Sequence, residues 1–192
     1  MHQWKEAHSI RGLNEAHMLP TIPKPDFYFG FTIYESKRYR NYGFEKEDSF
    51  QNFTDRTLLH LKSKGLCSAP TSGFAAYLKD KNSMSRHDLL CFPWAVVELK
   101  KSEEGNRRSE TTRAYCQAAN ATSTALCMLE NLAQGPERKW NNQHIPPVVG
   151  FTCVGGKCKV WLTYSHPASE RKRDHVSVQP FDLVLFLIAI WS

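Results

Sequence analysis

The chain has 192 residues, of which 41% are apolar and 23% are charged. This length and composition are those of one globular domain, and they exclude a disordered or fibrous protein. The 25 lysines and arginines outnumber the 19 acidic residues, which gives a net charge of +6. An acidic partner is compatible with this charge, although the charge itself says nothing about the fold.

The N-terminal residues lack the pattern of a secretory leader. The first apolar residues, Trp4, Ile10 and Leu13, are separated by charged and polar positions instead of forming one run. The longest apolar run, 183–191, is about half of the roughly 20 residues that a membrane-spanning helix needs. We therefore expect an intracellular protein, nuclear or cytoplasmic, without a membrane partner. Residues 1–19 would form an arm or a helix, and 20–192 the domain.

The first half of the domain contains one clear strand. Prolines at 20, 23 and 25 predict an extended entry, because each restricts the residue before it. The aromatic and β-branched run 27–33 then predicts a strand. The following sequence is mostly polar. Within it we predict a helix over 54–64 that Thr54 caps and Gly65 ends, a loop over 68–73 and a short strand over 74–78.

The second half contains the longest elements. A nearly continuous apolar run, 89–99, predicts a strand in a sheet covered on both faces. Apolar residues at helical spacing predict a helix over 110–134, capped by Ser109 and ended by Gly135-Pro136. Segment 148–164 predicts a hairpin that turns at Gly155-Gly156, and 181–191 a last apolar element. This order predicts an α/β fold, with the helix packed on a mixed β-sheet of about four strands.

The apolar strand ends in an acid and a lysine. Because side chains alternate along a strand, Glu98 and Lys100 lie on the same face of it. Such a pair suits metal-assisted hydrolysis of a phosphodiester, in which a carboxylate holds Mg²⁺ and an ammonium stabilises charge on the phosphate. The chemistry needs a second carboxylate. Asp26 ranks first because it opens the aromatic strand, Asp88 ranks second and Asp80 third.

Together with Gln117 on the long helix, these residues resemble the PD-(D/E)XK nuclease superfamily. More narrowly, four segments resemble nuclease-like domains of uncharacterised fungal proteins: 23–30, 92–101, 117–120 and 146–152. The resemblance covers roughly 20–164. It implies a restriction-endonuclease-like core with flanking helices. The chain between Asp26 and Glu98 is longer than a tight strand hairpin requires, so 34–88 is expected to be an insertion, or else the second acid lies elsewhere. It also implies that Asp26 and Glu98 bind Mg²⁺ or Mn²⁺, that Lys100 is the catalytic lysine, and that Gln117 belongs to the active site.

Two functions follow from this resemblance. The first is Mg²⁺-dependent hydrolysis of phosphodiester bonds in nucleic acid, with DNA as the expected substrate. The second is a nuclease-like module without turnover that binds nucleic acid or protein. The lysines and arginines of the polar segments are interleaved with acids, a pattern as typical of a solvated surface as of a phosphate track. The sequence therefore leaves both functions open, and the oligomeric state with them.

Six cysteines among 192 residues do not predict a disulfide scaffold. One close pair, Cys153 and Cys158, would face each other across the hairpin turn. We interpret both as reduced packing thiols, with a cross-strand disulfide as the second alternative. Zinc is the third, because no further Cys or His pair has zinc-finger spacing. A secreted, disulfide-bearing effector rests on this pair alone, and the missing leader argues against it.

Overall fold

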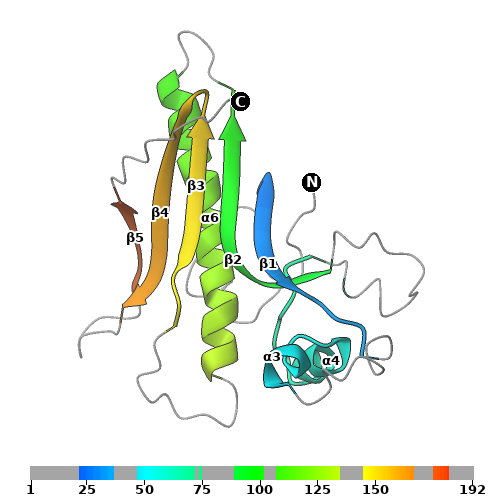
Figure 1. The fold of residues 1–192 in the computed structure, drawn as a ribbon. Coiled ribbons are helices and arrows are strands. Elements are labelled where there is room, and N and C mark those ends of the chain that lie inside the picture. The colour runs from blue at the N-terminus through cyan, green and yellow to red at the C-terminus, as the bar shows by residue number, and fades with distance from the viewer. Residues whose placement is uncertain are drawn as a thin grey trace.

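The structure is a computed structural model that describes residues 22–36, 47–71, 74, 89–101, 107–134, 145–166 and 175–181. Within these ranges a five-stranded sheet has the order β1-β2-β3-β4-β5, and the long helix α6 lies along it (Figure 1). The strands are β1 (Phe27–Thr32), β2 (Leu90–Lys100), β3 (Val148–Val154), β4 (Lys157–His166) and β5 (His175–Phe181). The helices are α3 (Asp48–Gln51), α4 (Asp55–Ser63) and α6 (Arg107–Gln134).

The sheet is mixed, because only β2 and β3 are parallel and the other three pairs are antiparallel. Helix α6 connects the two parallel strands, as a parallel pair requires. The predicted α/β class and the hairpin turning at Gly155-Gly156 are confirmed. The sheet has one strand more than the expected four, since β5 was not predicted. The alternating sequence 175–179 directly follows a polar segment, and its pattern was not recognised as a strand. The apolar run 183–191 lies outside the described residues.

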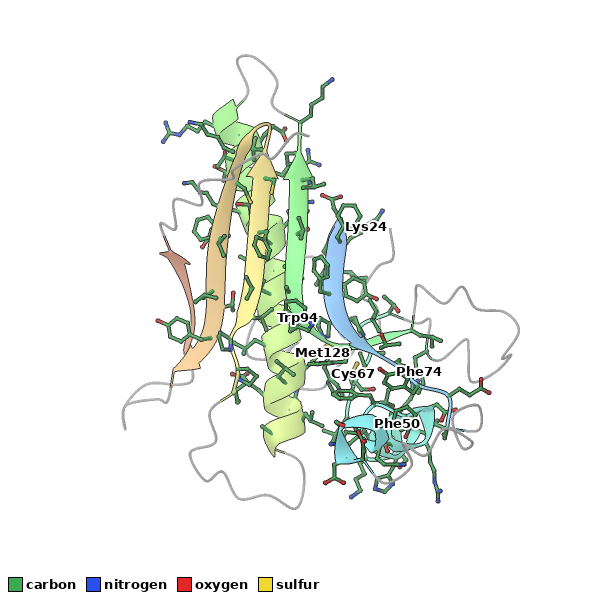
Figure 2. The ribbon with its side chains drawn as sticks, viewed as in Figure 1. Lys24, Phe50, Cys67, Phe74, Trp94 and Met128 are labelled. Carbon is green, nitrogen blue, oxygen red and sulfur yellow. The ribbon has the colours of Figure 1, made fainter. Side chains whose placement is uncertain are left out.

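One face of the sheet packs against α6. Val96 and Val148 from the sheet meet Ala121, Ala125, Leu126 and Met128 from the helix, and all are fully or almost fully buried. The alanines let the helix axis approach the strands closely, because their side chains are small. Figure 2 shows Met128 on α6, in this layer. These contacts fix the position of α6 along β2 and β3.

A second core lies beyond the lower end of β1, where α3 and α4 pack (Figure 1). Leu58 is fully buried there against Ile33, Phe74 and Phe92. The predicted helix at 54–64 is confirmed. The Thr54 side chain accepts a hydrogen bond from the Thr57 N–H, and Gly65 follows the helix with φ +78°. The predicted strand over 74–78 is wrong at Phe74, which is helical, and 75–78 lie outside the described residues. The alternation there was too short to distinguish a strand from a helical turn.

Strand β2 bends where it passes from one core to the other. Phe29 of β1 pairs with Ala95, but Phe31 pairs with Cys91, so β2 has two more residues than β1 in this interval. Within the bulge Phe92 has φ +46°, a value that a non-glycine residue rarely adopts. Gly30 lies opposite, and a Cβ atom there would be 2.6 Å from the Cys91 carbonyl oxygen. Glycine at position 30 thus permits the close approach of β1 to the bulge.

Two further expectations are corrected by the structure. Helix α6 begins at Arg107, so Ser109 lies in its first turn and does not cap it. The predicted cover on both faces is absent, within the described residues, from the second half of β2. On the face opposite α6, Phe27, Phe29 and Leu99 are exposed. The Phe29 ring packs against the exposed Trp94 ring, with centroids 5.7 Å apart. In the described ranges no helix has both the length and the apolar content to cross a bilayer.

Candidate active site

The pairing of β1 with β2 brings the three predicted charged residues together. Phe27 pairs with Val97, which sets Asp26 beside Glu98 at the start of β1. Lys100 lies two residues further along β2, on the same face as Glu98. Its Nζ atom is 3.4 Å from Glu98 Oε2 and 3.6 Å from Asp26 Oδ2. One ammonium therefore contacts both carboxylates.

The backbone holds the Asp26 carboxylate in place. Asp26 Oδ2 accepts a hydrogen bond of 2.8 Å from the Leu99 N–H. Strand β1 begins at Phe27, so its backbone does not extend far enough to pair with Leu99. The Asp26 side chain accepts the Leu99 N–H in place of a backbone carbonyl. This hydrogen bond also gives Asp26 a structural role as the end of the β1–β2 pairing.

Glu98 is the most buried member of the cluster, at 1% exposure. Burial raises its pKa from 4.5 to about 7. The Lys100 ammonium opposes this increase, and the Asp26 carboxylate adds to it. Glu98 Oε2 contacts Lys100, whereas Oε1 is buried and accepts no hydrogen bond from the described residues. A buried acceptor without a donor is unfavourable, and a bound cation would satisfy it.

Gln117 lies on the sheet-facing side of α6. Ala121, about one helical turn further along, packs with Val96 in the core. Helix α6 runs antiparallel to β2 (Figure 1), and Glu98 follows Val96 on the same strand face. Gln117 is thus placed at the height of Glu98. Its Oε1 atom is also buried and accepts no hydrogen bond from the described residues, so a second acceptor oxygen lies at this level.

The neighbouring strands add polar residues that the sequence analysis did not single out. Thr152 of β3 pairs with Glu98 and is buried, and its hydroxyl accepts a 2.9 Å hydrogen bond from Trp161 Nε1. The Trp161 ring packs on Tyr115 of α6, with centroids 4.6 Å apart, and Lys159 Nζ lies 6.0 Å from the ring centroid. The alternation of polar and apolar residues along β3 and β4 could have shown that Thr152 and Trp161 lie in strands. Which residues of β2 they lie beside could not be known without the strand pairing.

The oxygen donors fit a hard divalent cation. Mg²⁺ is usually held by one or two carboxylates together with waters and phosphate oxygens. Asp26 and Glu98 supply two carboxylates, and the unsatisfied Oε1 of Glu98 provides an acceptor within the buried site. Among the residues that the structure describes, no group of three or more His, Cys, Asp or Glu side chains is arranged for a metal. The alternatives Asp80 and Asp88 lie outside these residues.

A separate cavity of about 390 Å³ lies in the second core region, between β1 and α3. Phe31, Tyr34, Phe50 and Phe53 are among the described residues that line it. None of Asp26, Glu98 and Lys100 is in its described lining, so this cavity is distinct from the charged cluster.

Compared with known proteins, the chain matches no family model, no curated protein and no solved structure. The resemblance to PD-(D/E)XK nucleases therefore stays a prediction, carried by the residues quoted above. The function has to be argued from the cluster itself.

Proposed function

We propose that the protein is a Mg²⁺-dependent nuclease with a restriction-endonuclease-like core, and that DNA is its substrate. The observation that carries this proposal is the buried, unsatisfied Glu98 Oε1 next to a second carboxylate and a lysine. The two carboxylates lie close together, and the lysine contacts Glu98 through Oε2 alone, which leaves Oε1 as an acceptor for a cation. The PD-(D/E)XK resemblance supports the same assignment.

In this proposal Asp26 and Glu98 would hold Mg²⁺ or Mn²⁺, and Gln117 would offer its amide oxygen nearby. The ion, when bound, supplies charge stabilisation at the phosphate oxygens. The Lys100 ammonium shifts from the carboxylates toward the phosphate, where it stabilises the negative charge that develops during attack by water. The Leu99 N–H keeps the Asp26 carboxylate aimed into the site. Burial of Glu98 excludes bulk water and strengthens each of these electrostatic interactions.

The second candidate is a nuclease-like module that binds nucleic acid or protein without turnover. It is favoured by the limited access to the cluster, since the side chains of Asp26 and Lys100 are only 12% and 17% exposed. In this state the ammonium contacts both carboxylates. Because burial raises the pKa of Glu98 to about 7, this carboxyl can keep a proton, and the three groups then form a neutral polar network. Such a network stabilises the β1–β2 pairing without any metal.

Cleavage assays with matched lysine variants distinguish the two candidates. Wild-type protein is incubated with supercoiled plasmid and with single-stranded DNA in Mg²⁺, in Mn²⁺ and in a chelator. Lys100→Met removes the ammonium of the cluster, whereas Lys101→Met removes an exposed ammonium one residue away. Isothermal titration calorimetry measures Mg²⁺ binding by wild type and by Glu98→Gln.

The nuclease proposal predicts metal-dependent cleavage by wild type and by Lys101→Met. Loss of a charge-stabilising group at an active site commonly lowers the rate about 10²–10³-fold, and we expect Lys100→Met to fall in this range. Mg²⁺ binding should be lost in Glu98→Gln. A folded wild-type protein that neither binds the metal nor cleaves either substrate refutes the proposal and leaves the binding module.

A further inference from the structure

Two cysteine thiols face each other across the β3–β4 hairpin, outside the charged cluster. Cys153 and Cys158 are direct partners in the strand register, and their Sγ atoms are 3.0 Å apart. Both are unbonded thiols. We propose that this pair is a thiol–disulfide exchange site, which reacts with low-molecular-weight disulfides and closes to a reversible cross-strand disulfide.

The hairpin turn sets the distance between the two residues. Gly155, with φ +58°, occupies the first position of a two-residue turn, and Val154 pairs with Lys157 on either side of it. A two-residue turn closes on a hydrogen-bonded pair, so the next pair along the strands is of the non-hydrogen-bonded kind. The Cα atoms of such pairs are about 4.5 Å apart, within the range that a disulfide spans. The bond can therefore form without moving the backbone.

The surroundings distinguish these thiols from others in the chain. Cys91 and Cys127 are buried, so a disulfide in solution does not reach their sulfur atoms. Cys153 and Cys158 are both partly exposed. Burial, together with the neighbouring Cys158, raises the pKa of Cys153 to about 12. The Cys153 thiol donates a hydrogen bond to Cys158 Sγ, which favours a thiolate on Cys158. In the proposal Cys158 therefore reacts first, and Cys153 resolves.

The exchange takes place in two balanced steps. Cys158 loses its proton and attacks one sulfur of the small disulfide, whose S–S bond breaks and releases one small thiolate. Cys153 then loses its proton and attacks the Cys158 sulfur of the mixed disulfide, which releases the second thiolate. The cysteine pair gives up two protons and two electrons, and the small disulfide is reduced to two thiols.

The turn between the two cysteines is hydrogen-bonded to the end of β2. Gly155 N donates a 3.0 Å hydrogen bond to the carbonyl oxygen of Lys100, so the turn is joined to the end of β2. Residues 153 and 158 precede and follow this turn, and a disulfide between them would fix it to a single hairpin geometry. Neither Cys153 nor Cys158 belongs to the charged cluster, so the exchange site does not depend on the proposed nuclease function.

Mass spectrometry of the native full-length protein tests the proposal. The protein is equilibrated in buffers of graded oxidised and reduced glutathione, remaining thiols are alkylated, and trypsin is added. Cleavage after Lys157 separates the two cysteines, so that a disulfide appears as the dipeptide 158–159 attached to the peptide that contains Cys153. Cys158→Ser removes one partner. Cys116→Ser, at an exposed cysteine on α6, is the matched control.

We expect the linked peptides to become the main form of both segments in the oxidised buffers and to disappear when reduced glutathione is restored. Cys116→Ser should behave as wild type, and Cys158→Ser should give no linked product. Three results would overturn the proposal: full alkylation of Cys153 and Cys158 in every buffer, stable glutathione adducts without linkage, or linkage of either residue to another cysteine. Each is read from wild type directly, so it does not depend on how well a variant folds.

Discussion

Replacing Glu98 by glutamine removes a buried charge while keeping the size of the side chain. Burial gives the Glu98 carboxyl a pKa of about 7 in the folded protein, against 4.5 for an ordinary glutamate. The folded state therefore binds the proton more tightly than the unfolded state. Stability from this group is complete below about pH 4.5, is lost as the pH rises, and levels off above about pH 7. The increase in pKa corresponds to about 3 kcal/mol, at about 1.4 kcal/mol for each pH unit.

Glutamine stays neutral at every pH. At pH 8 the free energy of unfolding of Glu98→Gln, measured with urea, should therefore exceed that of wild type by up to about 3 kcal/mol. At pH 4.5 the two proteins should have nearly the same free energy of unfolding. Asp48→Asn, at an exposed carboxylate, is the control and should not show this gain. A difference between wild type and Glu98→Gln that is the same at pH 4.5 and pH 8, or a less stable variant at pH 8, would refute the reasoning.

Two further predictions concern the framework of the site. Gly30→Ala should lower the free energy of unfolding by about 1–3 kcal/mol, because the new methyl group meets the Cys91 carbonyl oxygen. Gly156 has open space around it, so Gly156→Ala should change the free energy of unfolding by less than about 0.5 kcal/mol. Equal effects in urea unfolding would contradict the close approach at Gly30. Thr152→Val should lower the free energy of unfolding by about 1 kcal/mol, because the Trp161 N–H loses its acceptor. Urea unfolding followed by tryptophan fluorescence measures this loss, and an unchanged midpoint would show that the hydrogen bond is not needed.

The parts of the site that lie along one strand could be predicted from the sequence. Alternation alone sets Glu98 and Lys100 on one face, and an acid at the start of a neighbouring strand is expected beside them if the two strands pair. The structure brings Asp26 to this position. The roles of these residues and of Gln117 stay predictions, because the arrangement is compatible with both a catalytic site and a closed polar network.

What the sequence could not provide depends on contacts between distant segments. Thr152 and Trp161 become neighbours of the cluster only through the pairing of three strands. The bulge at Phe92 arises because β2 has more residues than β1 between two successive paired positions. The local sequence of either strand does not show this difference. The burial of Glu98, and with it the raised pKa, depends on α6 lying across the sheet. Ser109 was a reasonable cap by residue type, but the helix begins two residues before it, at Arg107.

The first strand has a consequence for the order in which the site assembles. Asp26 and Leu99, joined by a hydrogen bond, are 73 residues apart in the chain, and within the described residues β1 pairs with β2 alone. Closing so long a loop is entropically unfavourable, and an edge strand separates more easily than a central one. A chain with β2, α6 and β3 in place but β1 undocked would contain Glu98 and Lys100 without Asp26. Completion of the charged cluster therefore depends on the long-range pairing of β1 with β2, and opening of this edge strand alone would remove the second carboxylate.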